Sequence, residues 1–287
     1  MSKVHKDIND NEIRVISPTQ PAEPQAPAQA RPRKPWPWIV LALIIVAAVV
    51  ALVWALLPAR DEQPLKPAPA KDIEAVVPQE GNDAMPTVLI SDTTVNGTAL
   101  TLLRPLNLTP SLHLGTDVLS DSTVKMAFQA ADIRADNGGI VGAFVLKGDL
   151  LSKGQSKAGF CAILGGTMTI GVADSTPLLE QAIETDGYFF RQFPLVVGGQ
   201  IVENKQTSSA LRKALAEIGG QHIVVLSKDR LTMHDFSQAL TDLGVSNAIY
   251  LVGSTSYGFA TDPRGRKAEF GQRVDAPAPN TTYILWR

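Results

Sequence analysis

The chain has 287 residues, of which 45% are hydrophobic and 19% are charged, so it can form at least one domain with a buried core. Its formal net charge is −2, and no basic stripe with interleaved aromatic residues occurs outside a short segment at 31–34, which excludes a typical nucleic-acid-binding domain. The single cysteine, Cys161, excludes an internal disulfide, and its apolar neighbours predict a buried, unreactive thiol.

Residues 1–37 are polar and carry regularly placed prolines. Such a composition cannot bury a core, and we expect a disordered tail. Its polyproline character also suits a docking motif for a partner protein, although the same composition is common in linkers. Residues 58–83 repeat the pattern and predict a Pro-rich, semi-extended linker.

Residues 38–57 are twenty consecutive residues without a charge, enough for a helix to cross the hydrocarbon core of a bilayer. Trp38 and Trp54 lie at or near its ends, where indole rings favour the membrane interface. The basic residues at 31–34 place the N-terminus in the cytoplasm. We predict a single-pass protein of the inner (plasma) membrane with a periplasmic or extracellular domain. A cleaved signal peptide is the alternative, but the preceding tail is long and no small-x-small cleavage site follows.

Residues 84–287 show short apolar or alternating runs separated by turn residues, a pattern typical of strands. Asn96-Gly97 between two such runs predicts a hairpin. Strands are expected at 98–103, 124–128, 142–146, 160–164, 167–172, 193–197, 222–226, 248–252 and 283–286. Helices are expected at 178–183, 209–218 and 234–243, the last capped by Thr232 and ended by Gly244. We therefore predict an α+β fold, a mixed β-sheet domain with a few packed helices.

Familiar catalytic motifs do not occur: there is no His-Glu-x-x-His, no Walker loop and no Gly-x-Ser-x-Gly. The four histidines are far apart in the sequence, so no metal site is expected, and nothing identifies a cofactor. Glycine-rich turns at 136–139, 165–166, 198–199 and 253–256 are the candidates for holding an anion through backbone amides and hydroxyls. The simpler alternative is that each glycine only turns the chain.

The order of four segments resembles the phosphodiester glycosidase family, from about residue 133 to the C-terminus. They are the turn Asn137-Gly138-Gly139, the strand from Gln192 with its glycine turn, Arg212-Lys213-Ala214-Leu215, and Leu243-Gly244-Val245-Ser246-Asn247-Ala248 continuing to Ser256. The last segment fits the family pattern without a gap and is the most specific of the four.

The resemblance implies a site for a glycan or sugar phosphate in which Asn137, Arg212 and Ser254 converge around one cleft. It implies catalytic roles for Asp136, Asn137 and Arg212, and arginine suits bidentate contacts to phosphate. It implies substrate-binding roles for Gly138, Gly139, Gln192, Gly253, Ser254 and Ser256.

Val252 stands where the family carries an acidic residue. A valine can neither protonate a leaving oxygen nor activate water. Asp136 or Asp262 could replace that acid if the fold brings either one close. Two functions therefore stay open: hydrolysis of a sugar-phosphodiester linkage in the cell envelope, and binding of an envelope glycan or partner protein by an inactive relative. A purely structural anchor in an envelope assembly is a third, and it predicts an exposed apolar patch.

Overall fold

The computed structural model describes residues 85–154, 156–273 and 278–287. The predicted tail (1–37), membrane span (38–57) and linker (58–83) lie outside the described residues. Within the part of the chain that the structure describes, no helix combines the length and hydropathy needed to cross a bilayer.

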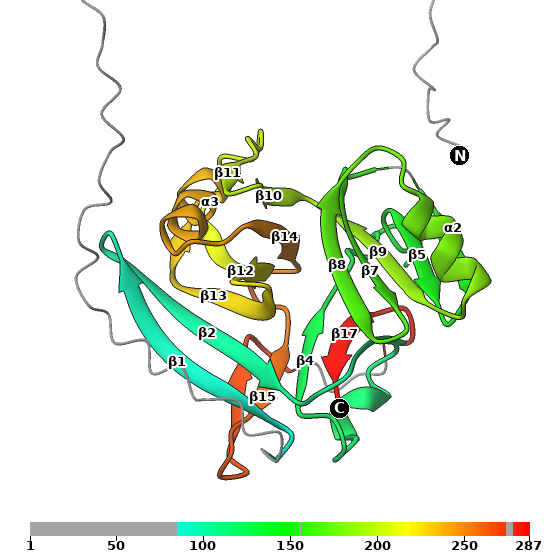
Figure 1. The fold of residues 1–287 in the computed structure, drawn as a ribbon, viewed down its shortest axis with the longest axis horizontal. Helices are drawn as coiled ribbons and strands as arrows, with labels where there is room; N and C mark the ends of the chain where they lie inside the picture. The colour runs from blue at the N-terminus through cyan, green and yellow to red at the C-terminus, as the bar shows by residue number, and fades with distance from the viewer. Residues whose placement is uncertain (1–84, 155, 274–277) are drawn as a thin grey trace, which may run out of the picture. The chain divides into compact units, whose positions relative to one another are not determined.

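Three β-sheets form the described domain (Figure 1). The seven-stranded sheet has the order β1 (Thr87–Val95), β2 (Thr98–Leu106), β13 (Gln221–Leu231), β12 (Ala210–Ile218), β14 (Asn247–Leu251), β10 (Pro194–Val197) and β11 (Gln200–Ile201). The second sheet has the order β16 (Lys267–Phe270), β15 (Gly258–Thr261), β4 (Met126–Gln129), β17 (Thr282–Trp286) and β3 (Pro110–Leu114). The third has the order β6 (Asp149–Lys153), β5 (Ala143–Leu146), β9 (Tyr188–Gln192), β7 (Gly159–Leu164) and β8 (Thr167–Val172).

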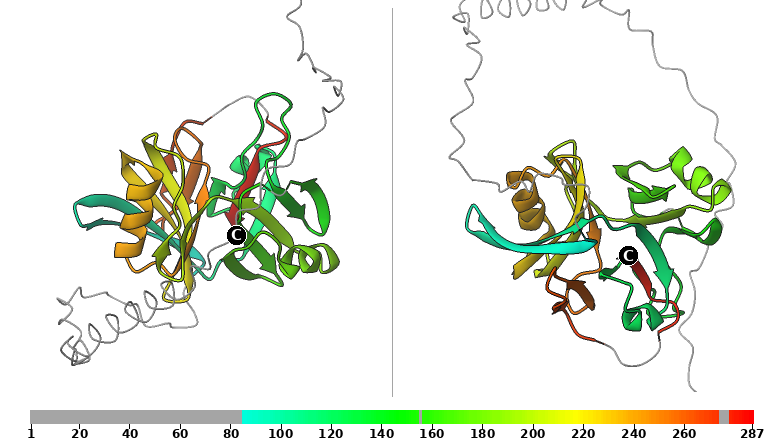
Figure 2. Two further views of the ribbon diagram at one scale, coloured as in Figure 1. Left: turned by 90° about the horizontal axis from the view of Figure 1, so that it is seen from above. Right: turned by 60° about the horizontal axis from the view of Figure 1, so that its bottom comes forward.

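Two α-helices cover outer faces of these sheets, and a short 3₁₀ helix, η1 (Asp117–Ser120), precedes β4. Helix α3 (Met233–Asp242) packs on the seven-stranded sheet, and α2 (Pro177–Glu184) packs on the third sheet. The two helices lie at opposite ends of the described domain (Figures 1 and 2). The fold is therefore mostly β with a few packed helices, as the sequence predicts.

Strand alternation builds one central core from all three sheets. Leu215 of β12, Phe128 of β4 and Ile163 of β7 are buried in the same apolar cluster. Their neighbours along each strand point the other way: Ala214 packs under α3, and Ala162 packs under α2. Successive side chains of a strand point to opposite faces of the sheet. One face of each sheet therefore contributes to the shared core, and the other face packs against separate elements.

Several local predictions are confirmed. The hairpin turn of β1 and β2 is Asn96-Gly97, whose positive φ angles of 48° and 84° fit a two-residue turn that favours this pair. The hydroxyl of Thr232 accepts the amide of Asp235 at 3.1 Å and caps α3, and Gly244 follows the helix with φ 89°. Cys161 is fully buried, and burial raises the pKa of its thiol.

The helix predicted at 209–218 is wrong, because this segment forms strand β12. Its Ala, Leu, Arg, Lys and Glu residues are strong helix formers, but helix propensity is a weak preference that tertiary contacts override. β12 pairs with β13 on one side and with β14 on the other. Small Ala214 and Ala216 on one face fit beneath α3, which explains a central strand made of helix-forming residues.

Candidate functional site

The ends of strands from different sheets meet at one place. The amide of Val252 donates to the carbonyl of Gln129 at 3.2 Å, which joins the end of β14 to the end of β4. The amide of Tyr250 donates to the carbonyl of Phe193 at 2.8 Å, and that of Ser254 donates to the carbonyl of Leu211 at 2.7 Å. We call this region, residues 129–132, 192–193, 211–213 and 250–256, the strand junction.

Arg212 lies on β12 within the strand junction and is 2% exposed. Its Nε donates to the carbonyl of Leu231 at 2.9 Å, and Nη2 donates to the carbonyl of Ser208. Nη1 lies 3.4 Å from the hydroxyl of Tyr250, and the guanidinium carbon is 5.7 Å from the centre of that ring. The arginine is therefore held rigidly by neutral acceptors.

Lys213 is the next residue and is 3% exposed. Strand alternation places it on the opposite face from Arg212, where its amine donates to the carbonyl of Ser256 and to the Ser256 hydroxyl, the latter at 2.6 Å. That hydroxyl donates in turn to the carbonyl of Val252. Burial lowers the pKa of Lys213 to about 8. The lysine thus fastens the 252–256 turn to the sheet.

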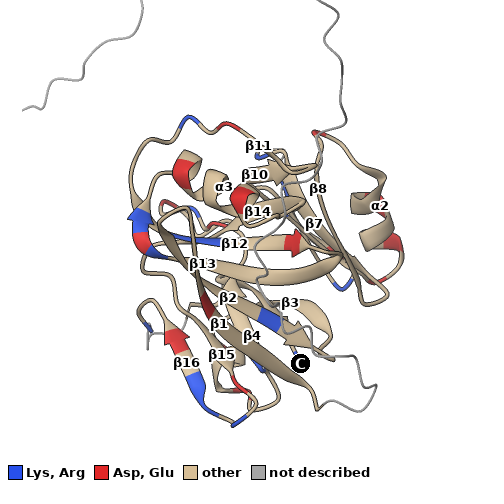
Figure 3. Ribbon diagram, turned by 60° about the vertical axis from the view of Figure 1, so that its left-hand side comes forward, with Lys and Arg blue, Asp and Glu red and all other residues tan. Residues whose placement is uncertain are grey.

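Neither of these two cations forms an ion pair with a carboxylate among the described residues. Burying a charge without an opposite charge is expensive, and the cost falls when an anion arrives beside it. Figure 3 shows positively charged positions on β12, which lies in the middle of the seven-stranded sheet. The strand junction therefore has an excess of buried positive charge.

Val252 is half-buried and follows β14, whose last residue, Leu251, pairs with Lys213. Its amide donates to the carbonyl of Gln129, and the hydroxyl of Tyr250, two residues earlier, contacts the guanidinium of Arg212. Val252 therefore belongs to the strand junction, and it offers no carboxylate to either buried cation.

The predicted residues Gly253 and Ser254 lie close to Arg212. A side-chain carbon built on Gly253 would be 2.2 Å from the Tyr250 hydroxyl, so the turn needs glycine there to pack against the tyrosine. Ser254 is exposed and has a φ of 54°. Its amide donates to the carbonyl of Leu211 and the amide of Ser256 donates to the carbonyl of Gly253, so the exposed hydroxyl of Ser254 is the group that this turn offers to a ligand. Arg212, Gly253, Ser254 and Ser256 are thus brought together.

Gln192 lies in the same junction but is 0% exposed. Its Nε2 donates to the carbonyl of Ala130 at 3.2 Å and to the carboxylate of Asp132 at 3.3 Å. Its Oε1 accepts the amine of Lys157 at 2.9 Å, and Lys157 also forms an ion pair with Asp132. Gln192 therefore holds other polar residues in place and does not itself reach the surface.

Asp136, Asn137, Gly138 and Gly139 form a separate turn beyond β4. The turn is closed by a bridge between Ile133 and Ile140, and Asn137 accepts the amide of Gly139 at 2.9 Å. Asp136 is exposed and bound to Arg134, and that hydrogen bond lowers the pKa of the carboxyl group. Across the described ranges, no hydrogen bond joins this turn to Arg212 or Ser254. Whether Asn137 acts on a ligand stays a prediction.

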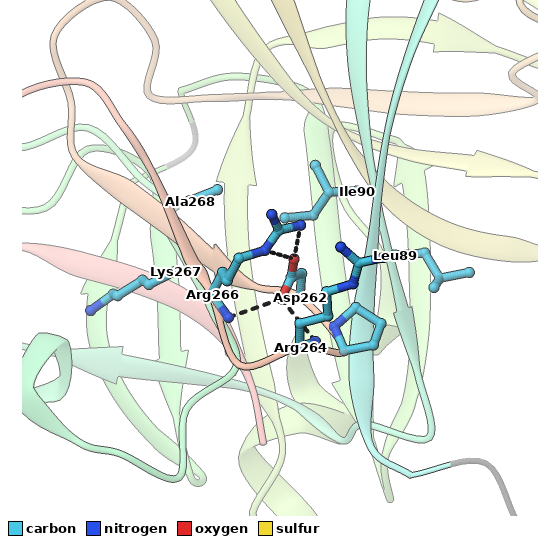
Figure 4. Close-up of a pocket in the computed structure, with 8 residues that line it drawn as sticks. Leu89, Ile90, Asp262, Arg264, Arg266, Lys267 and Ala268 are labelled. Carbon is cyan, nitrogen blue, oxygen red and sulfur yellow. Dashed lines mark hydrogen bonds and ion pairs between the residues drawn. The ribbon is translucent and has the colours of Figure 1, made fainter.

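Asp262 lies away from the strand junction, in a groove of about 550 Å³ between β1 and the β15–β16 hairpin (Figure 4). Gly258 pairs with Phe128 near the junction, whereas Thr261 at the other end of β15 contacts Lys125. The carboxylate accepts the side chain of Arg266 at 2.8 Å and the amide of Arg264 at 2.9 Å. It therefore closes its own hairpin turn and does not replace an acid at Val252.

The structure adds residues that sequence reasoning missed: Asp132, Lys157, Phe193, Lys213 and Tyr250. Lys213 follows Arg212 in the sequence, but the helix predicted at 209–218 gave no reason to expect that its side chain is buried. Asp132 and Lys157 are 25 residues apart in the sequence, and they come together in a fold whose next strands, β5 and β7, both pair with β9.

Comparison with known proteins places this site in a family context. The family model for phosphodiester glycosidases matches residues 122–285. No curated protein matches the sequence. One similar structure is the zebrafish N-acetylglucosamine-1-phosphodiester alpha-N-acetylglucosaminidase catalytic domain, auto-inhibited by its pro-peptide, with TM-score 0.51, 14% identity, and coverage of 72% of this chain and 84% of that one. Another is a hypothetical protein from Synechocystis, with TM-score 0.54, 14% identity, and coverage of 70% and 62%. At this identity both show the fold alone.

Proposed function

The chain belongs to the phosphodiester glycosidase family, and on that premise we propose that its strand junction binds a sugar phosphodiester or a related anionic glycan. The family and the fold supply the class of ligand. Because 14% identity to the solved structures transfers no residue roles, the charge distribution of this chain carries the rest of the proposal.

The observation that carries the proposal is the pair of buried cations beside Val252. Arg212 and Lys213 have no carboxylate partner among the described residues, so a phosphate at the exposed Ser254 turn would supply the missing negative charge. Phosphate suits this place because its oxygens accept hydrogen bonds from hydroxyls such as that of the exposed Ser254.

Hydrolysis is expected to be weak. Glycoside cleavage needs a group that protonates the leaving oxygen or activates water, and Val252 provides neither. Asp136 is tied to Arg134 and Asp262 is tied to Arg266, so neither candidate acid serves this place. We infer a protein that holds its ligand and turns it over slowly.

The test measures binding and turnover separately. Isothermal titration with a synthetic diester of N-acetylglucosamine 1-phosphate should give saturable binding to the purified chain, while sugar release stays low. Arg212→Met should weaken binding, and Arg264→Met, in the β15–β16 hairpin, is the matched control. Thermal melting of each variant excludes unfolding as the cause. Robust sugar release by the unmodified chain would contradict the proposal.

We propose further that the domain works outside the cytoplasm, tethered by the apolar segment 38–57 and spaced from the membrane by the linker 58–83. The supporting observation is the length and uncharged character of the segment together with its basic N-terminal flank at 31–34. In that location the ligand would be envelope glycan, and an envelope protein partner is the alternative that a non-catalytic relative allows.

A further inference from the structure

We propose that Asp132 and Phe193 form a sugar subsite within the strand junction, where the carboxylate accepts sugar hydroxyls and the aromatic ring stacks on the sugar face. The inference rests on the proposed function, because it names where the sugar of the anionic ligand binds. None of the residues predicted from the sequence forms this subsite.

One lysine holds the two groups side by side. The amine of Lys157 forms an ion pair with Oδ2 of Asp132, and it lies 4.7 Å from the centre of the Phe193 ring. The carboxylate and the ring are therefore both neighbours of a single ammonium group. A pyranose presents hydroxyls at its edge and an apolar face, which match a carboxylate and an aromatic ring held beside the same ammonium group.

The supporting residues are buried and the two proposed contacts are not. The side chain of Lys157 is 6% exposed and Gln192 is fully enclosed, whereas the Asp132 side chain is 35% exposed and Phe193 is 38% exposed. Gln192 fixes the arrangement, since its amide donates to Asp132 and accepts from Lys157 and from the amide of Phe193. A rigid polar support behind two exposed recognition groups is what a preorganised binding site requires.

The other oxygen of the carboxylate is open. Oδ2 of Asp132 accepts both Lys157 and Gln192, while Oδ1 has no partner among the described residues. An ionised carboxylate oxygen is a strong acceptor for a sugar hydroxyl. Lys157 also adopts a φ of 71°, a strained conformation for a side-chain-bearing residue, and such strain gathers where a site must be held in shape.

Tyr250 connects the sugar subsite to Arg212. The carbonyl of Phe193 accepts the amide of Tyr250, and the hydroxyl of Tyr250 contacts Arg212. In this proposal the neutral sugar lies against Asp132 and Phe193, and the phosphate lies at the exposed Ser254 turn toward Arg212. This arrangement predicts that the two parts of the ligand are recognised independently.

The experiment uses the full-length chain in detergent and three probes. These are the diester of N-acetylglucosamine 1-phosphate, its sugar half as methyl N-acetyl-α-glucosaminide, and glycerol phosphate as its anionic half. Titration calorimetry follows the diester and glycerol phosphate, and saturation-transfer NMR follows the sugar. Asp132→Asn and Phe193→Ala should weaken diester binding about tenfold and remove the sugar signal while leaving glycerol phosphate binding unchanged.

Matched controls separate the subsite from general effects. Val197→Ala changes an equally exposed apolar residue of β10 and should bind all three probes normally. Phe193→Ala leaves the Asp132–Lys157 pair intact, so it tests the subsite even if Asp132→Asn destabilises the fold. An unchanged sugar signal in both subsite variants overturns the subsite, whatever the diester does. Loss of diester and glycerol phosphate binding in the unmodified chain, with the sugar signal retained, overturns the proposed function alone.

Discussion

Lys213 belongs to the candidate site and also makes the free energy of unfolding depend on pH. Its pKa is lowered to about 8 in the folded chain because burial disfavours the charged amine. In the unfolded chain the amine stays protonated up to about pH 10.4, so between these values the unfolded state binds more protons. Stability should therefore rise with pH across this window, and below it the folded chain carries the full cost of the buried charge.

We predict that Lys213→Met removes this dependence. The gain in unfolding free energy between pH 7.5 and pH 10 should be smaller in the variant by about 2 kcal/mol, measured by urea denaturation. Lys228→Met, which removes an exposed lysine, is the control and should keep the slope of the unmodified chain. Equal slopes in the Lys213 variant and the unmodified chain would show that the amine is not held in a desolvated state.

Val252→Asp should add a carboxylate to the strand junction and raise turnover of a sugar-1-phosphate diester by about a hundredfold, the scale of general acid-base catalysis. The physical reason is that a carboxyl group protonates a leaving oxygen or activates water, and valine does neither. Sugar release under saturating substrate measures the effect. Val252→Asn is the matched control, since it has the same shape without the charge, and a rise in both variants would point to shape alone.

Part of the candidate site can be traced to the sequence. Arg212, Gly253 and Ser254 lie close together because one family motif spans the end of β14 and another begins β12, whereas their role in binding stays a prediction. Asp132 and Phe193 were not predictable, because their proximity depends on a third residue, Lys157, that reaches both. Gln192 was predicted to contact a ligand, but its side chain is fully buried. This burial results from tertiary packing, which the adjacent residues in the sequence do not reveal.

Helix α3 offers a test at the scale of one element. Thr232 caps it by accepting the Asp235 amide, and its hydroxyl donates back to the Asp235 carboxylate at 2.7 Å. Thr232→Ala should lower the unfolding free energy by about 1 kcal/mol, because a first-turn amide loses its acceptor. Chemical denaturation checks this value. Thr207→Ala, in an exposed loop, should have no comparable effect.

Elements whose structure is set by a few adjacent residues could be predicted from the sequence. Elements whose structure depends on pairing with distant strands could not. The capped helix α3 and the Asn96-Gly97 hairpin depend on a few adjacent residues, and both are confirmed. β12 depends on strands on both sides of it, so its helix-forming composition misleads. Strands β9, β15 and β16 lie in segments for which the sequence predicts no element.

At the scale of the whole molecule, the predicted anchor can be tested directly. A C-terminal alkaline phosphatase fusion to the full chain should be active, because this enzyme matures only outside the cytoplasm and the basic residues at 31–34 are expected to keep the N-terminus inside. Alkaline carbonate should leave the protein in the membrane fraction. Deleting residues 38–57 should abolish phosphatase activity, whereas deleting part of the linker 58–83 should not.

The order of the strands in the sheets determines where a truncated form of this protein can begin. The family match begins at residue 122, yet β2 pairs with β13, and β3 pairs with β17. A fragment started at the match boundary would lack β2 and β3 and would leave one edge of β13 and one edge of β17 without a hydrogen-bonding partner, which favours self-association. An expression clone should begin before Thr87, and recovery of a well-behaved monomer from a clone starting at residue 122 would show that these N-terminal strands are dispensable.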